Sequence, residues 1–221
     1  MPGAFITFEG GEGAGKSTQI ERLRRRLEAQ GHSVLVTREP GGSERAERIR
    51  EFLLSGRAKA LGTFAETILF SAARLDHLEK TIRPALAAGR IVLSDRFSDS
   101  TRAYQGAAGA LEPDLLDAVE RVVLAGTEPV LTLILDLPES IGMSRAVDRR
   151  GDARADRFEG EGAAFHAALR QAFLDVAKAA PQRCAVIDGS RDPDTVEKEI
   201  WDVVRTRLPD LAAPREHVAH G

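Results

Sequence analysis

Short apolar runs alternate along the chain with longer segments whose apolar residues recur at helical spacing. The short runs, rich in β-branched and aromatic residues, are typical of strands, whereas helical spacing is typical of a helix with one buried face. The pattern predicts five strands, at residues 4–8, 34–37, 91–94, 130–135 and 184–187. It predicts helices at residues 18–30, 44–54, 64–88 with a break near Pro84, 113–125, 138–150, 165–180 and 193–208.

The order of these elements predicts an α/β fold. The run 130–135 is nearly all apolar, as expected for a parallel strand covered on both faces. Strands that alternate with helices form an open parallel sheet with helices on both faces. We therefore expect one domain over residues 1–208, in which Ser43 caps the helix that starts at Glu44. The tail, 209–221, lacks apolar periodicity and is expected to be flexible.

Composition narrows the functional classes. The net charge of −3 gives no general attraction to nucleic acid or to an anionic membrane, so neither partner is expected. Cys184 is the only cysteine, which excludes an intrachain disulfide and suits a reducing compartment. No apolar run reaches membrane-spanning length, and the first strand begins without a signal-peptide pattern. The expectation is a soluble cytoplasmic enzyme.

Residues 10–17 match G-x-x-x-x-G-K-[ST], the phosphate-binding P-loop. The match lies between a predicted strand and a predicted helix, which is the context that the motif requires. There the glycines let successive backbone N–H groups point inward, and the helix dipole adds positive potential. Lys16 is placed to reach the β- and γ-phosphates, and Ser17 to ligate Mg²⁺. The residues expected at the phosphates are Gly10, Gly11, Glu12, Gly13, Ala14, Gly15, Lys16, Ser17 and Thr18.

Several P-loop chemistries are open at this point. A guanine-nucleotide switch protein requires an Asn-Lys-x-Asp segment, and the chain contains no asparagine. The single D-x-x-G string, at 148–151, follows a predicted helix instead of a strand. These observations favour a compact kinase with a small acceptor. Another nucleoside or nucleotide kinase, and a nucleotide-dependent switch protein, remain as alternatives.

Four segments together resemble the thymidylate kinase family in its bacterial form. They are F-E-G with G-A-G-K-S at 8–17, T-R-E-P-G-G at 37–42, D-R-F at 95–97 and S-T-R-A-Y-Q-G at 100–106. The resemblance runs from the first strand to the last helix. It implies transfer of the γ-phosphoryl group of ATP to dTMP, giving dTDP for dTTP synthesis, with Mg²⁺ and in a homodimer.

Charged residues at predicted strand ends supply the acceptor side. Arg96 follows the strand 91–94 closely, and a guanidinium binds phosphate bidentately. Asp95 beside it can hold Mg²⁺, directly or through water. The alternative for this pair is an ordinary surface ion pair. The resemblance assigns Arg38 to the acceptor phosphate as well.

Phe70 and Arg74 are four residues apart on one predicted helix and so share a face. Spacing alone favours an ordinary core role for Phe70, whereas the resemblance implies stacking on thymine, with Arg74 at a carbonyl edge. It further places Tyr104 against the 2′ position of the sugar and Glu12 near its 3′-hydroxyl. The residues implied to bind dTMP are Glu12, Arg38, Phe70, Arg74, Arg96, Ser100, Thr101, Tyr104 and Gln105.

A basic segment follows the helix 138–150. Some members of the family that the chain resembles carry an arginine in the P-loop itself. Because Gly13 follows Glu12 here, the resemblance implies that the arginine at the transferring phosphoryl group comes from elsewhere. The segment at about 149–160 resembles the bacterial-type lid that closes over ATP; the alternative is a solvated basic loop. The residues implied in catalysis are Lys16, Arg96, Arg149, Arg150 and Arg154, and the sequence leaves open which lid arginine acts.

Overall fold

The computed structural model describes residues 3–107, 109–150, 158 and 160–213, with the side chains at 149 and 150 outside the described set. Its strands form one sheet, and every neighbouring pair is parallel. They are β1 (Phe5–Glu9), β2 (Val34–Arg38), β3 (Ile91–Asp95), β4 (Leu131–Asp136) and β5 (Cys184–Asp188). The order across the sheet is β2-β3-β1-β4-β5, which confirms the predicted five-stranded parallel α/β fold.

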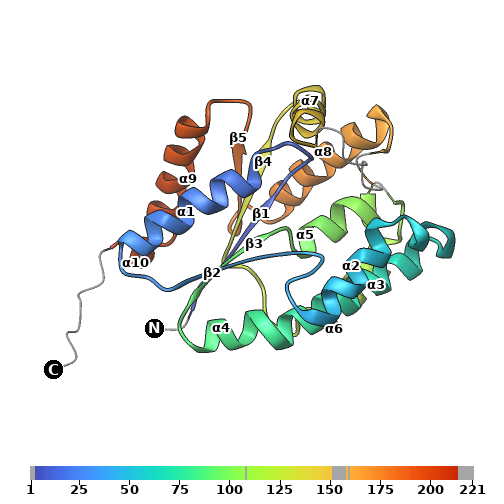
Figure 1. The fold of residues 1–221 in the computed structure, drawn as a ribbon, viewed down its shortest axis with the longest axis horizontal. Helices are drawn as coiled ribbons and strands as arrows, with labels where there is room; N and C mark the ends of the chain where they lie inside the picture. The colour runs from blue at the N-terminus through green and yellow to red at the C-terminus, as the bar shows by residue number, and fades with distance from the viewer. Residues whose placement is uncertain (1–2, 108, 151–157, 159, 214–221) are drawn as a thin grey trace.

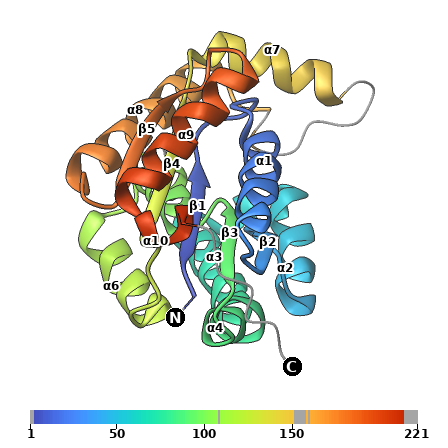
Figure 2. The ribbon, with the colours of Figure 1, turned by 90° about the vertical axis from the view of Figure 1, so that its left-hand side faces the viewer.

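Helices cover both faces of this sheet (Figure 1). One layer contains α1 (Lys16–Ala29), α9 (Pro193–Arg207) and α10 (Pro209–Ala212), which face the viewer in Figure 2. The other side carries α2 (Glu44–Leu54), α3 (Thr63–His77), α4 (Arg83–Ala87), α5 (Ser98–Thr101), α6 (Pro113–Leu124) and α8 (Ala163–Ala179). The helix α7 (Glu139–Arg150) follows β4 and packs on α8.

The alternation of side chains along β1 explains the two layers. Ile6 and Phe8 point into the core beneath α1 and α9, whereas Phe5 packs on the opposite face with Phe97, their rings 4.8 Å apart. Both faces of the strand are therefore buried, as the apolar pattern predicted. On the second face the hydroxyls of Thr7 and Thr132 lie 2.8 Å apart and link β1 to β4.

The predicted break near Pro84 is wrong. Helical structure continues from α3 through a π-helical turn, η2 (Leu78–Ile82), into α4, where Pro84 lies in the first turn. Pro84 has no N–H to donate, and the π turn directly before it changes the hydrogen-bond register, so the helical path continues past the proline. Two further helical turns, η1 (Arg57–Leu61) and η3 (Arg102–Ala107), and the short α5 have no apolar periodicity that could predict them.

Two local expectations also need correction. Ser43 does precede α2, but its hydroxyl donates to Asp76 Oδ2 of α3 at 2.6 Å and makes no capping bond. Residues 209–212 do not belong to a flexible tail, because they form α10, which packs Leu211 against the core, and the Leu211 carbonyl oxygen lies 3.0 Å from His32 Nε2. The rest of the expected tail, 214–221, lies outside the described residues. None of the helices in the described ranges combines the length and apolar character of a membrane span.

Candidate functional site

A cavity of about 340 Å³ lies at the carboxyl ends of the strands, where the P-loop meets the segments after β2 and β3. Strand register brings these segments together, since Asp95 of β3 pairs with both Phe8 of β1 and Arg38 of β2. The predicted site residues that line it are Glu12, Gly13, Ala14, Gly15, Lys16, Ser17, Thr18, Arg38, Phe70, Arg74, Asp95, Arg96, Ser100, Thr101, Tyr104 and Gln105. Gly10 and Gly11 line a second, smaller cavity beside β4.

The P-loop curls tightly between β1 and α1. Gly10 and Gly13 have φ values of 130° and 66°, a region that favours glycine. A Cβ atom at Gly10 would collide with the carbonyl oxygen of Leu135, and one at Gly13 with that of Gly142. The loop therefore packs directly on the end of β4 and on α7, and its backbone ends at the N-terminus of α1, where a helix favours anions.

Lys16, the first residue of α1, folds back over this loop. Its Nζ donates to the carbonyl oxygens of Gly10 at 3.2 Å and Gly11 at 2.9 Å. Burial, reinforced by the nearby Arg96 guanidinium, lowers the pKa of Lys16. A bound anion at the loop would offset this by favouring the charged ammonium.

Ser17 and Asp95 meet at the floor of the cavity. The Ser17 hydroxyl donates to Asp95 Oδ2 at 3.0 Å, so a hydroxyl and a carboxylate oxygen lie side by side at the N-terminus of α1. Two hard oxygen donors beside a phosphate-binding loop suit Mg²⁺, which commonly takes few protein ligands and completes its shell with water and phosphate oxygens. The residues therefore fit the ion that the P-loop pattern implies.

Arg96 adopts an uncommon backbone conformation, with φ of 70°, and its N–H donates to the carbonyl oxygen of Phe8. Its guanidinium donates to Gly10 O at 3.0 Å, to Ser100 Oγ at 3.3 Å and to Glu12 Oε1 at 2.6 Å. Burial opposes the charge, but the Glu12 and Asp95 carboxylates hold the pKa of Arg96 above its usual range. Arg96 is thus a fixed cation between the P-loop and the rest of the cavity.

Glu12 has protein partners that sequence reasoning did not anticipate. Besides Arg96, it accepts a hydrogen bond from the Tyr104 hydroxyl at 3.1 Å. The Arg96 guanidinium also lies 5.1 Å from the centre of the Tyr104 ring. Burial raises the pKa of Tyr104 well above its usual value, so its hydroxyl remains a donor. These three residues form one hydrogen-bonded group at the middle of the cavity.

Aromatic side chains make the opposite wall. Phe70 is half-buried, and the centre of its ring lies 6.3 Å from that of Phe158. The Phe158 and Tyr104 rings pack edge to face, with their centres 4.9 Å apart. Phe158 falls in the segment that resembles a lid, and sequence reasoning did not single it out. Aromatic rings therefore line one side of the cavity and charged side chains line the other, which suits a ligand with a planar ring and a phosphate.

Arg74 and Arg38 take different positions. Arg74 is buried at 3% exposure, and its Nε donates to Glu39 Oε2 at 2.7 Å. Arg38 lies at the mouth of the cavity, where it pairs with Glu47 of α2 at 3.1 Å. In the sequence, Glu39 stands out only as part of the R-E-P-G-G segment. In the structure it forms a buried ion pair with Arg74.

The remaining expected residues divide in two. Thr101 and Gln105 are buried and line the cavity, and Thr101 Oγ1 accepts from Arg74 Nη2 at 2.9 Å. Of the lid arginines, Arg149 and Arg150 end α7 but their side chains lie outside the described set, and Arg154 lies in a range that is not described. Their roles stay predictions.

Comparison with known proteins gives one family throughout. The family model described as Thymidylate kinase matches residues 8–200. A thymidylate kinase of Caulobacter vibrioides is 57% identical over 93% of this chain and 98% of its own length, and one of Bradyrhizobium diazoefficiens is 55% identical over 93% and 90%. A crystal structure of thymidylate kinase from Ehrlichia chaffeensis matches with a TM-score of 0.73 and 34% identity, covering 93% of this chain and 99% of that one. With this match across the P-loop, the segments after β2 and β3 and nearly the whole sheet, the chain belongs to the thymidylate kinase family.

Proposed function

We propose that the chain transfers the γ-phosphoryl group of ATP to dTMP, with Mg²⁺, and so makes dTDP for dTTP synthesis. The observation that carries this proposal is the single cavity in which a P-loop, a buried arginine and an aromatic wall face one another. Family membership supports the choice of dTMP as acceptor. Phosphoryl transfer asks a protein mainly for positioning and for positive charge around the transferring group, and the cavity offers both.

On the donor side, the P-loop N–H groups and the N-terminus of α1 would hold the ATP phosphates. Lys16 would leave the carbonyl oxygens of Gly10 and Gly11 for phosphate oxygens, which accept more strongly because they are charged. Ser17 and Asp95 would hold Mg²⁺, with Asp95 acting directly or through water. Bound there, Mg²⁺ would neutralise charge on the donor phosphates.

On the acceptor side, Arg96 is the main candidate for the dTMP phosphate, with Arg38 assisting from the mouth of the cavity and Ser100 beside it. Phe70 would stack on thymine, and Arg74, Thr101 and Gln105 would hydrogen-bond its edge. The Tyr104 ring would lie against C2′ of the sugar. Glu12, which already bonds Arg96 and the Tyr104 hydroxyl, would accept from the 3′-hydroxyl.

The lid is part of the proposal. Arg149, Arg150 and Arg154 lie on or after the end of α7, which starts three residues after β4 and thus near the P-loop edge of the sheet. We assign to this group the arginine charge that the P-loop lacks and the exclusion of water from the transferring phosphoryl group. Single substitutions of the three arginines would distinguish them, because loss of the acting one lowers kcat with little change in KM for dTMP.

We also infer a cytoplasmic homodimer. Apolar side chains stay exposed on α3 and α6, which pack on each other: Phe64 at 46%, Ile68 at 42%, Leu115 at 40% and Val122 at 75%. Such a face suits a second copy of the chain. Sedimentation of the wild type against a Val122→Asp, Ile68→Asp variant tests it; an unchanged mass would contradict this interface.

The function is tested by ATP consumption with Mg²⁺ against dTMP, dUMP, dCMP, dGMP, UMP and thymidine. The proposal expects strong turnover with dTMP and weaker turnover with dUMP. Turnover with thymidine in place of dTMP would move the acceptor to a nucleoside. If ATP binds but none of these acceptors is phosphorylated, the result would favour a nucleotide-dependent switch protein.

A further inference from the structure

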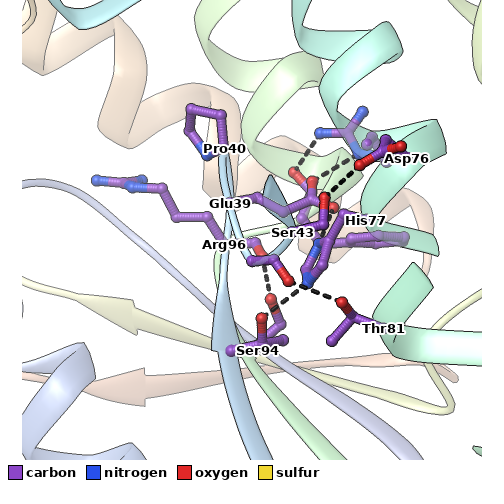
Figure 3. Close-up of polar contacts among 12 residues, drawn as sticks. Glu39, Pro40, Ser43, Asp76, His77, Thr81, Ser94 and Arg96 are labelled. Carbon is purple, nitrogen blue, oxygen red and sulfur yellow. Dashed lines mark hydrogen bonds and ion pairs between the residues drawn. The ribbon is translucent and has the colours of Figure 1, made fainter. Parts of the chain in front are cut away.

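Glu39 follows β2 and is 5% exposed, between the sheet and α3. Its two carboxylate oxygens have different partners on that helix: Oε2 accepts from Arg74 Nε at 2.7 Å, and Oε1 accepts from His77 Nδ1 at 3.0 Å. Arg74 and His77 are three residues apart and so share one face of α3. The carboxylate therefore clamps this face to the end of β2 (Figure 3).

The clamp is backed by a further contact. Because a carboxylate only accepts, Nδ1 of His77 carries the proton toward Glu39. His77 Nε2 lies 2.7 Å from Thr37 Oγ1 of β2, and the imidazole is fully buried. In the neutral ring Nε2 then accepts from the Thr37 hydroxyl. The imidazole that holds Glu39 is thus itself held by Thr37 of β2. The Arg96 side chain extends away from this cluster in Figure 3.

The clamp determines which part of Arg74 is left for a ligand. While Glu39 takes the Nε hydrogen, Nη2 donates to Phe97 O at 3.1 Å and to Thr101 Oγ1 at 2.9 Å. These bonds use the Nε hydrogen and both Nη2 hydrogens, and Nη1 has no hydrogen bond with any described residue. Arg74 lines the cavity, so Nη1 is the nitrogen that a ligand can use.

We propose that Glu39 is a positioning residue that fixes Arg74 so that only Nη1 meets the acceptor base. A guanidinium has donors and no acceptor. A carbonyl oxygen at C4 of the pyrimidine accepts from Nη1, whereas an amino group at C4 presents hydrogens to hydrogens. The inference rests on the proposed function, since it concerns the base of the proposed acceptor.

The decisive variant is Glu39→Gln. The amide keeps the size of the side chain, and its oxygen can still accept from Arg74 Nε. Its NH2 group, however, faces the N–H of His77 Nδ1 and cannot accept from it, and the negative charge that holds the guanidinium is lost. We expect KM for dTMP to rise about tenfold, the factor of a weakened hydrogen bond to a charged group, with KM for ATP unchanged. The ratio of kcat/KM for dTMP to that for dCMP should fall by a similar factor.

Two further variants separate positioning from a general structural role. Glu120→Gln changes another buried carboxylate, which lies on α6 outside the cavity and pairs with Arg102 of η3. Glu120 acts on Arg74 through its charge and makes no hydrogen bond with it, so this variant should leave both the KM for dTMP and the dTMP/dCMP ratio unchanged. Glu39→Asp retains the charge and should recover part of the ratio. If Glu39→Gln folds but keeps the wild-type KM and ratio, or if Glu120→Gln shifts the ratio equally, the proposal is overturned.

The wild-type panel keeps this proposal distinct from the proposed function. Wild-type turnover of an acceptor other than dTMP would refute the function while leaving Glu39 to be judged by the same KM change with that acceptor. A wild type that phosphorylates dCMP as well as dTMP would overturn the selection by Arg74 and leave phosphorylation of dTMP standing.

Discussion

Glu9 anchors the loop that carries Arg96, and its ionisation gives a quantitative prediction. This last residue of β1 is fully buried, and its Oε1 accepts from the N–H groups of Phe97 at 2.8 Å and Ser100 at 3.2 Å. Its Oε2 lies 2.6 Å from the Ser100 hydroxyl. Burial, together with the negative charge of Asp99, raises the pKa of Glu9 from 4.5 to about 8.

The sign of the effect follows from proton linkage. Because the folded state binds this proton more tightly than the unfolded state, the resulting stabilisation is complete below the unfolded pKa of 4.5 and is lost as pH rises through about 8. For a single site with these two values, the free energy of unfolding falls by roughly 3 kcal/mol from about pH 6 to about pH 9.

Glu9→Gln isolates this contribution. The amide imitates the protonated carboxyl group, since its oxygen can accept from both N–H groups and its nitrogen can donate to Ser100 Oγ. The variant lacks the titration, so its stability relative to the wild type should increase by roughly 3 kcal/mol over the same pH range. Urea unfolding at a series of pH values, followed by circular dichroism, measures the difference.

A matched control uses Glu28→Gln, an exposed carboxylate on α1, whose stability curve should run parallel to that of the wild type. If the Glu9→Gln curve is also parallel to the wild type from about pH 6 to about pH 9, Glu9 does not titrate in this range and the reasoning fails.

Three further predictions concern the proposed roles. Arg96→Ala should lower kcat/KM for dTMP about 100-fold or more, the usual cost of one preorganised charge at a reacting group, while KM for ATP stays within a few-fold; retained catalysis would remove Arg96 from the site. Ser17→Ala should raise the Mg²⁺ concentration for half-maximal rate about tenfold, because one of two adjacent oxygen ligands is lost, and an unchanged Mg²⁺ titration would contradict the assignment beside Asp95. Tyr104→Ala should relax discrimination against a 2′-hydroxyl, seen as a fall of about tenfold in the turnover ratio of dTMP to its ribose analogue; a fixed ratio would refute that role.

Much of the fold could be predicted because its signals are local. The strand 130–135 is apolar at nearly every position, and the glycines at 10 and 13 are demanded by their own positive φ values. The short α5 and η3 are different. They follow β3 without apolar periodicity, and their shape depends on bonds that Ser100 and Thr101 make with Glu9 and Arg74 from elsewhere in the chain.

The candidate site divides in the same way. Lys16, Asp95 and Arg96 were predictable because parallel strands bring their carboxyl ends to one edge. Glu39 could not be predicted as a site residue, because its role depends on contacts with Arg74 and His77 that only the fold brings about. Phe158 could not be predicted either, because a single phenylalanine outside any motif does not indicate where it will pack. The pairing of Glu12 with Arg96 likewise depends on the conformation of the loop after β3.

The most direct test of the proposed function is a crystal structure with dTMP, Mg²⁺ and a non-hydrolysable ATP analogue. We expect both nucleotides in the one cavity, with the dTMP phosphate within hydrogen-bond distance of Arg96 and thymine between Phe70 and Arg74 Nη1. The analogue's phosphates should lie on the P-loop, with Mg²⁺ near Ser17 and Asp95. A thymidine nucleotide bound outside this cavity, or one whose phosphate does not contact Arg96, would contradict the proposed acceptor site.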